Sequence, residues 1–324
     1  MNLLKPRQFW KTGFRLLSGW RRIVFLSFFL CAGAYAAVDA HTETAASAEE
    51  EHLSPDAPVL FKAGRVPVTN SMITGWLAVV LLTALSLRYH HQMRAGRRTI
   101  FTASVECLVT ALLDFLANIM GEQLARRTFW LMGSFFVFIL FANLMGLFPG
   151  IGSIGWGETK GHLFHISKPL FRGVNADLNT TLALGAIFFL FWFIWSVKIN
   201  GPAGFLKHIF GFDGDAKGIV RVAMVVVFFA VGFLEVLSIL IRPFSLALRL
   251  YGNIFAGEVV LETMLHKIPS LGWLLPVPFY LLEALVGLVQ ALVFTLLSAV
   301  FVMLMCGGGH HEETHSKTEI KQEE

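Results

Sequence analysis

Charged residues, cysteines and catalytic motifs are all scarce in this chain of 324 residues. Only 15% of the residues are Asp, Glu, Lys or Arg, whereas 55% are hydrophobic and 31 are Phe. The three cysteines have no paired spacing, so we expect neither a disulfide nor a zinc site. HExxH, GxSxG, P-loop and paired-histidine patterns are also absent, which argues against an integral-membrane enzyme. We therefore expect no metal and no cofactor.

The apolar residues are gathered in runs, several of which reach the roughly 20 residues that a helix needs to cross a bilayer. We predict an all-α polytopic membrane protein with about five to six membrane helices. The predicted spans are 71–88, 128–148, 178–197, 219–265 and 272–305. The last two form a long helical hairpin. Its first arm is more than twice the length of a perpendicular span, so it must tilt strongly, lie nearly flat or break near Pro243.

Polar residues interrupt the apolar pattern at 100–125, which predicts an interfacial amphipathic helix on the cytoplasmic surface. Basic loops at 88–98 and 198–221 should stay in the cytoplasm, so the amino terminus is expected outside and the carboxyl terminus inside. The net charge of +4 mostly reflects such loops, and we do not interpret it as nucleic-acid binding.

The two ends of the chain differ from the membrane domain predicted for 71–306. Residues 1–36 are typical of a signal peptide, because arginines precede a short apolar run and AYA at 34–36 resembles a cleavage site; an uncleaved anchor is the alternative. Residues 37–70 are predicted to be an exported, acidic, flexible segment. Residues 307–324 are predicted to be a polar cytoplasmic tail.

Arg249 lies inside the mostly apolar segment 242–258, where a charge is costly. Estimates for an arginine at the centre of a bilayer run from about 2.5 to more than 10 kcal/mol, and an ion path or an ion-pair partner is the expected reason. At about 100° per residue, Arg249 shares one polar, small-residue face with Glu235, Ser238, Arg242, Ser245, Asn253, Ala256 and Thr263. Such a stripe can also serve helix–helix contact. Glu258 faces about the opposite side, so it does not pair with Arg249 on the same helix.

The sequence SLALRLYGNIFAGE at 245–258 closely resembles the signature of subunit a of the F-type ATP synthase membrane sector. Three weaker matches stand in that family's order: NLMGLFPG at 143–150, NADLNTTLAL at 175–184 and LLEALVGLVQALVFTLL at 281–297. The resemblance implies a stationary, non-catalytic subunit that forms two half-channels for protons and couples proton flow to ATP synthesis. It implies a bacterial inner membrane. The implied partners are a rotating c-subunit ring, peripheral-stalk b subunits, the rest of the complex and membrane lipid.

The resemblance also implies roles for single residues. Arg249 matches the essential arginine that faces the ring, and Asn253 matches the polar residue one turn later. Glu258, Glu283 and Gln290 match positions tied to the proton path. If Glu258 and Glu283 approach each other across the hairpin, they form a candidate relay pair on the entry side. Structural contact between helices is the alternative for Glu283 and Gln290.

Four further residues have two interpretations each. Asn175 and Asp177 match the polar motif near the external mouth, but Asp177 is also suited to cap the helix that begins at Leu178. Glu235 and Arg242 are candidates for a structural ion pair or for proton transfer. For the whole chain, the alternative is a secondary transporter whose buried arginine binds an anionic solute. Transporters commonly contain internal repeats, and the two halves of this chain show none.

Overall fold

The computed structural model describes residues 58–63, 66–148, 154–160, 163–210, 219–267 and 276–306. The predicted signal peptide, most of the exported acidic segment and the carboxyl-terminal tail lie outside these residues. Those three assignments therefore remain predictions.

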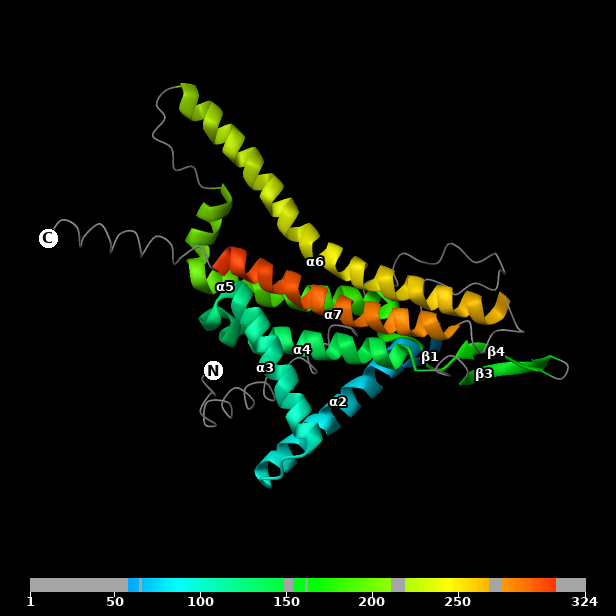
Figure 1. Ribbon diagram of the computed structural model, residues 1–324. Coiled ribbons are helices and arrows are strands. Elements are labelled where there is room, and N and C mark those ends of the chain that lie inside the picture. The colour runs from blue at the N-terminus through cyan, green and yellow to red at the C-terminus, as the bar shows by residue number, and fades with distance from the viewer. Residues whose placement is uncertain are drawn as a thin grey trace.

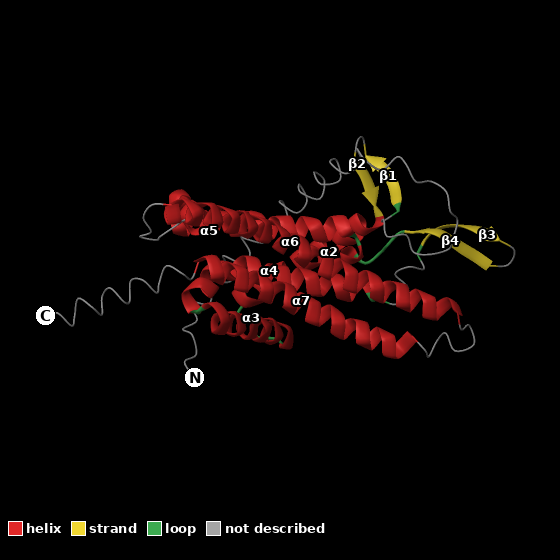
Figure 2. Cartoon of the chain, turned by 90° about the horizontal axis from the view of Figure 1, so that it is seen from above, coloured by secondary structure: helices red, strands yellow, loops and turns green. Residues whose placement is uncertain are grey.

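The described residues form a helical membrane fold, and six helices are long and apolar enough to cross a bilayer. Helices α4 (Glu122–Gly146), α5 (Leu178–Phe210) and α7 (Pro276–Cys306) run along a common direction, and the C-terminal part of α6 (Ile219–Lys267) packs along them. Figures 1 and 2 show this bundle from two sides. Its core contains large apolar side chains from all four helices: Phe129, Phe135, Ile187, Leu250 and Phe294. The prediction of an all-α membrane protein is confirmed.

Helices α2 (Asn70–Arg94) and α3 (Ile100–Met120) form a separate corner of the bundle. Gly121 adopts φ 81°, a conformation that glycine reaches without steric cost, and this breaks the predicted helix 100–125 between α3 and α4. In Figure 1, α3 runs across the direction shared by α4 and α7. That orientation suits the predicted interfacial helix, although the length and composition of α3 also fit a membrane span.

Helix α6 is continuous through Pro243, so the hairpin arm does not break there. Proline lacks an N–H and its ring crowds the preceding turn, and helices bend at such positions. Figure 1 shows α6 bent, with its N-terminal part leaving the bundle. As a result, only 11% of the apolar stretch of α6 is buried inside the protein, compared with 56% of the apolar stretch of α4.

Helix α5 continues beyond its predicted end. The sequence predicted a loop from residue 198, but the chain stays helical to Phe210. Gly201 has φ 71° inside this stretch, and Pro202 follows it. A proline is well suited to the first position of a helix. The chain therefore turns at Gly201 and begins a second short helix instead of leaving helical structure.

Two antiparallel hairpins, which the sequence analysis did not predict, lie at one end of the bundle. Strands β1 (Val59–Ala63) and β2 (Val66–Thr69) precede α2, and β3 (Gly155–Lys160) and β4 (Leu163–Pro169) follow α4. Figure 2 shows both hairpins at this same end. A short 3-10 turn, η2 (Val174–Ala176), then leads from β4 into α5.

Candidate functional site

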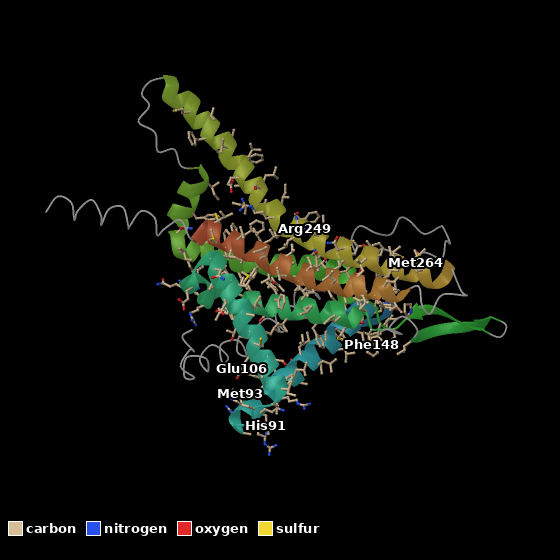
Figure 3. The ribbon with its side chains drawn as sticks, in the orientation of Figure 1. His91, Met93, Glu106, Phe148, Arg249 and Met264 are labelled. Carbon is tan, nitrogen blue, oxygen red and sulfur yellow. The ribbon has the colours of Figure 1, made fainter. Side chains whose placement is uncertain are left out.

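Arg249 lies next to the bend of α6, where the N-terminal part of this helix leaves the bundle (Figure 3). It lines an open hollow of about 480 Å³ together with residues of both hairpin arms: Leu234, Leu237, Ser238, Ile241, Arg242, Ser245, Leu246, Leu297 and Phe301. Four residues of the polar stripe predicted from the helical period therefore line a real concavity between α6 and α7: Ser238, Arg242, Ser245 and Arg249. Leu246 and Leu250, which lie off the stripe, are buried against the bundle.

The two arginines of this hollow have different surroundings. The Arg242 Nη2 lies 3.2 Å from the Glu235 Oε1, and its guanidinium lies 5.3 Å from the centre of the Phe301 ring. Glu235 and Arg242 thus form the intrahelical pair that the sequence offered as one of two interpretations. Arg249 is exposed, and no carboxylate of the described residues lies within ion-pair distance of it. A guanidinium remains protonated in proteins, so the α6 surface presents an uncompensated positive charge.

One turn beyond Arg249, Asn253 links the two arms of the hairpin. Its Nδ2 donates a hydrogen bond of 2.9 Å to the Oε1 of Gln290 on α7. Gln290 is 5% exposed, whereas Asn253 is exposed. The structure therefore brings these two predicted site residues into direct contact, at the border between the exposed face of α6 and the interior.

Glu258 faces away from Arg249, as its position on the helix predicted, and meets another arginine. The Arg172 Nε lies 3.2 Å from the Glu258 Oε2, with 3% of the Arg172 side chain exposed and 26% of Glu258. The Arg172 guanidinium also lies 5.7 Å from the centre of the Phe255 ring. The sequence analysis assigned no role to Arg172, because 86 residues separate it from Glu258 and no pattern in a loop predicts such a contact.

Arg172 is held in place through its backbone. Its N–H donates a 3.3 Å hydrogen bond to the Thr74 hydroxyl, which in turn donates to the carbonyl of Asn70 on α2. The next residue, Gly173, packs so tightly on Gly146 that a Cβ at 146 would lie 3.1 Å from the Gly173 Cα. The glycine of the NLMGLFPG motif therefore allows α4 to approach the loop that carries Arg172.

Glu283 lies across the hairpin from Glu258 and is 7% exposed. Its carboxyl group packs against the backbone of Gly257, where a Cβ would overlap both carboxyl oxygens. The Oε1 of Glu283 has no hydrogen-bond partner among the described residues. Gly257 is the residue immediately before Glu258 on α6. The two carboxylates that the sequence offered as a relay pair are thus neighbours.

A chain of amides connects this region to the interior of the bundle. The Asn175 Nδ2 donates to the Asn143 Oδ1 at 2.6 Å, and the Asn143 Nδ2 donates to the carbonyl of Gly287 on α7 at 3.0 Å. Gly287 is one turn from both Glu283 and Gln290 on that helix. Asn143 belongs to the NLMGLFPG motif but was not predicted as a site residue. The sequence feature that could have identified it is a polar amide inside an apolar span.

Asp177 takes part in two kinds of contact. Its Oδ1 accepts a 3.0 Å hydrogen bond from the backbone N–H of Asn179, which is the geometry of a helix N-cap. Its Oδ2 accepts a 2.5 Å hydrogen bond from the Ser71 hydroxyl of α2. Asp177 is 2% exposed. The structure therefore shows the capping contact and also places this carboxylate among the buried polar groups between α2 and α5.

The polar side chains form two separate groups along α6. One group surrounds the hollow at Arg242 and Arg249, and the other extends from Asp177 through Arg172 and Glu258 to Glu283, near the end that carries the β-hairpins. Among the described residues, no cluster of three or more His, Cys, Asp or Glu side chains could hold a metal ion. The arrangement offers groups that accept, donate or repel protons.

Comparison with known proteins gives a consistent result. The family described as ATP synthase A chain matches residues 72–303. The protein named ATP synthase subunit a of Bdellovibrio bacteriovorus is 32% identical over 63% of this chain and 74% of its own length. Its namesakes from Gloeobacter violaceus and Myxococcus xanthus are each 31% identical; they cover 72% and 76% of this chain and 82% and 76% of their own lengths.

Proposed function

The chain belongs to the ATP synthase A chain family, and from this premise we propose that it is the stationary proton-translocating subunit of an F-type ATP synthase. The proposal gives it two half-channels against a rotating ring of c subunits. The chain itself neither binds nor hydrolyses ATP; it couples proton flow to synthesis elsewhere in the complex. The single observation that carries the proposal is Arg249, an exposed cation on an apolar helix, with no carboxylate of the described residues as its counter-ion.

A cation in this position suits a partner whose acidic group alternates between two states. A deprotonated carboxylate on the ring is attracted to Arg249, with an energy of about 4 kcal/mol at 4 Å for an effective dielectric constant of 20. A protonated carboxyl group lacks this attraction and moves on into the lipid. The fixed charge also repels protons and hydronium, which prevents a direct leak. Lysine is a poor substitute, because burial lowers its proton affinity far more readily.

The apolar surface around Arg249 supports a ring as the partner. Along the α6 face, large side chains are exposed beside the hollow, among them Phe233, Leu237, Ile241 and Leu248. Contiguous exposed apolar surface marks an interaction site or a lipid contact. In this proposal the ring covers the face that holds Arg249, and lipid covers the remainder.

The two polar groups along α6 support two half-channels. We assign the group around Ser238, Arg242 and Ser245 to the cytoplasmic side and the group from Asn175 and Asp177 to the external side. This assignment follows from the predicted orientation, with the amino terminus outside and the carboxyl terminus inside an inner membrane. Peripheral-stalk b subunits complete the set of proposed partners. Family membership favours this function over the secondary transporter.

The test is ATP-driven proton pumping by the assembled complex in inverted membrane vesicles, followed with a pH-sensitive dye. Arg249→Ala should abolish pumping and leave the amount of the chain in the membrane unchanged. The matched control is Arg98→Ala, which removes an exposed arginine from the α2–α3 turn and should leave pumping intact. Normal pumping by the Arg249→Ala variant would refute the proposed function.

A further inference from the structure

The Arg172–Glu258 ion pair raises the question of which of two neighbouring carboxylates exchanges protons. The Glu283 carboxyl group on α7 packs against Gly257, the residue before Glu258 on α6, and Arg172 contacts Glu258 from the loop before η2. Two adjacent carboxylates resist being charged at the same time, unless a cation stabilises one of them. The structure provides such a cation to Glu258, so the two groups are not equivalent.

Resting on the function proposed above, we propose that Arg172 is a positioning residue that fixes Glu258 as a permanent counter-charge, so that Glu283 alone binds and releases the translocated proton. Arg172 acts on the path through Glu258 and does not itself carry protons. This divides the roles of two residues that the sequence had treated as one relay pair.

The surroundings of Arg172 explain why it holds Glu258 firmly. The guanidinium is 97% buried, stands beside the Phe255 ring, and is anchored through its backbone to Thr74. A planar guanidinium with its orientation set in this way loses little conformational freedom when it binds a carboxylate. Glu258 is therefore held toward the loop that contains Arg172, on the side of α6 away from Arg249.

The surroundings of Glu283 differ in the features that proton exchange requires. Its carboxyl group lies against the bare backbone of Gly257, a site that only glycine leaves open, and its Oε1 has no hydrogen-bond partner in the part of the chain that the structure describes. Among the described residues, no cation lies within ion-pair distance of it. A buried carboxyl oxygen without a partner is suited to hold a proton or to bind a water molecule that delivers one.

The inference predicts an unusual pattern of single and double substitutions. Glu258→Gln removes the counter-charge and leaves the Arg172 cation, which repels protons, beside the external path. Pumping per assembled complex should fall about tenfold or more, which corresponds to about 1.4 kcal/mol of activation free energy per tenfold. Removing the cation as well, in Arg172→Gln with Glu258→Gln, should restore at least half of that loss on a logarithmic scale, because a buried pair is better replaced as a whole than broken.

The experiment measures ATP-driven pumping in inverted vesicles that contain the whole complex, with the amount of the chain determined by immunoblot. Arg172→Lys replaces the planar guanidinium with an ammonium that burial can deprotonate, so its pumping should lie between that of the unmodified complex and that of Glu258→Gln. Glu283→Gln should stop pumping in both the normal and the double-variant background. Arg126→Gln serves as the matched control: it breaks the partly exposed Arg126–Glu122 pair on α4, outside both polar groups, and should not rescue Glu258→Gln.

A double variant that pumps no better than Glu258→Gln overturns the inference, since Glu258 would then exchange protons itself. Normal pumping by Glu283→Gln overturns it too. If the double variant does not assemble, Arg172→Met with Glu258→Leu replaces it; failure of both double variants where the single variants assemble also contradicts the inference. Failure of the proposed function would be recognised separately. The proposed function predicts that Arg249→Ala is inactive, whereas the inference about Arg172 makes no prediction for that variant.

Discussion

Arg249 and Arg172 are two arginines within one membrane domain, and their surroundings are opposite. Arg172 is 3% exposed, pairs with Glu258 and stands beside Phe255. Arg249 is exposed on the bent helix α6, and none of the described carboxylates neutralises it. The buried arginine already has its counter-charge within the chain, and the exposed one has none among the described residues; under the proposed function, a partner supplies it.

This difference indicates how the fold separates structural and functional charges. The turn η2 that follows Arg172 contacts α2, α4 and α6, and the Arg172 side chain is buried, so its charge requires compensation inside the chain. The bend at Pro243 moves the N-terminal part of α6 out of the bundle, and the hollow beside Arg249 remains open. Under the proposed function, a charge that interacts with a moving partner needs both the open face and the absence of a carboxylate within the chain.

The sharpest way to break the contrast is to give Arg249 a partner of its own. Ser245→Glu places a carboxylate one turn before Arg249, the orientation that favours an intrahelical ion pair. Pumping should then cease, because the paired Arg249 no longer attracts the carboxylate of the ring. Dye quenching in inverted vesicles measures this. Ser245→Gln, which has similar size and no charge, should retain most of the activity; equal activity of the two variants would show that the charge state of Arg249 is irrelevant.

The second test removes each arginine in turn and compares stability. Arg172→Met should lower the free energy of unfolding by about 3–5 kcal/mol, because it breaks a buried ion pair. Arg249→Met should change it by less than about 0.5 kcal/mol, as expected for a substitution at an exposed position. Thermal release of the chain from the purified complex provides the measurement. A larger loss of stability for Arg249→Met than for Arg172→Met would contradict the distinction between the buried, paired Arg172 and the exposed Arg249.

The third test concerns the space that the Glu283 carboxyl group occupies against Gly257, next to the Arg172–Glu258 ion pair. Gly257→Ala adds a Cβ that overlaps the Glu283 carboxyl group, so the end of this side chain must move away, at a cost of about 1 kcal/mol, the lower end for an overpacked site. Gly252→Ala, five positions earlier on α6, adds a Cβ with no atom within 4 Å and should be neutral or slightly stabilising. The same thermal assay compares the two variants. Similar midpoints would mean that Glu283 does not lie against Gly257.

The smallest effect is expected at the hydrogen bond between Asn253 on α6 and Gln290 on α7. Asn253→Ala removes the donor to Gln290 and should cost about 0.5–1.5 kcal/mol. In a double-mutant cycle, Asn253→Ala with Gln290→Ala should show a coupling of about 0.6 kcal/mol, the mean found for polar contacts within membranes. Strict additivity in the thermal assay would indicate that the 2.9 Å contact contributes nothing to stability.

The sequence by itself determined the membrane class, the approximate limits of the long helices and the position of Arg249 on a polar stripe. Each of these follows from local information: hydrophobic length, helical period and the cost of one charge in an apolar run. The separation of Arg249 from Glu258 around α6 came from the same period. The matches to family motifs added Glu283 and Gln290 as candidate residues of the proton path.

Only the tertiary structure decided which charges meet. The contact between Arg172 and Glu258 joins residues 86 positions apart, and the one between Asn143 and Gly287 spans 144. Such pairings depend on how α2, α4, α6 and α7 pack, which no local pattern contains. The glycines at 146 and 257 show the physical reason, since each allows a close approach that becomes visible only when the opposite group is in place.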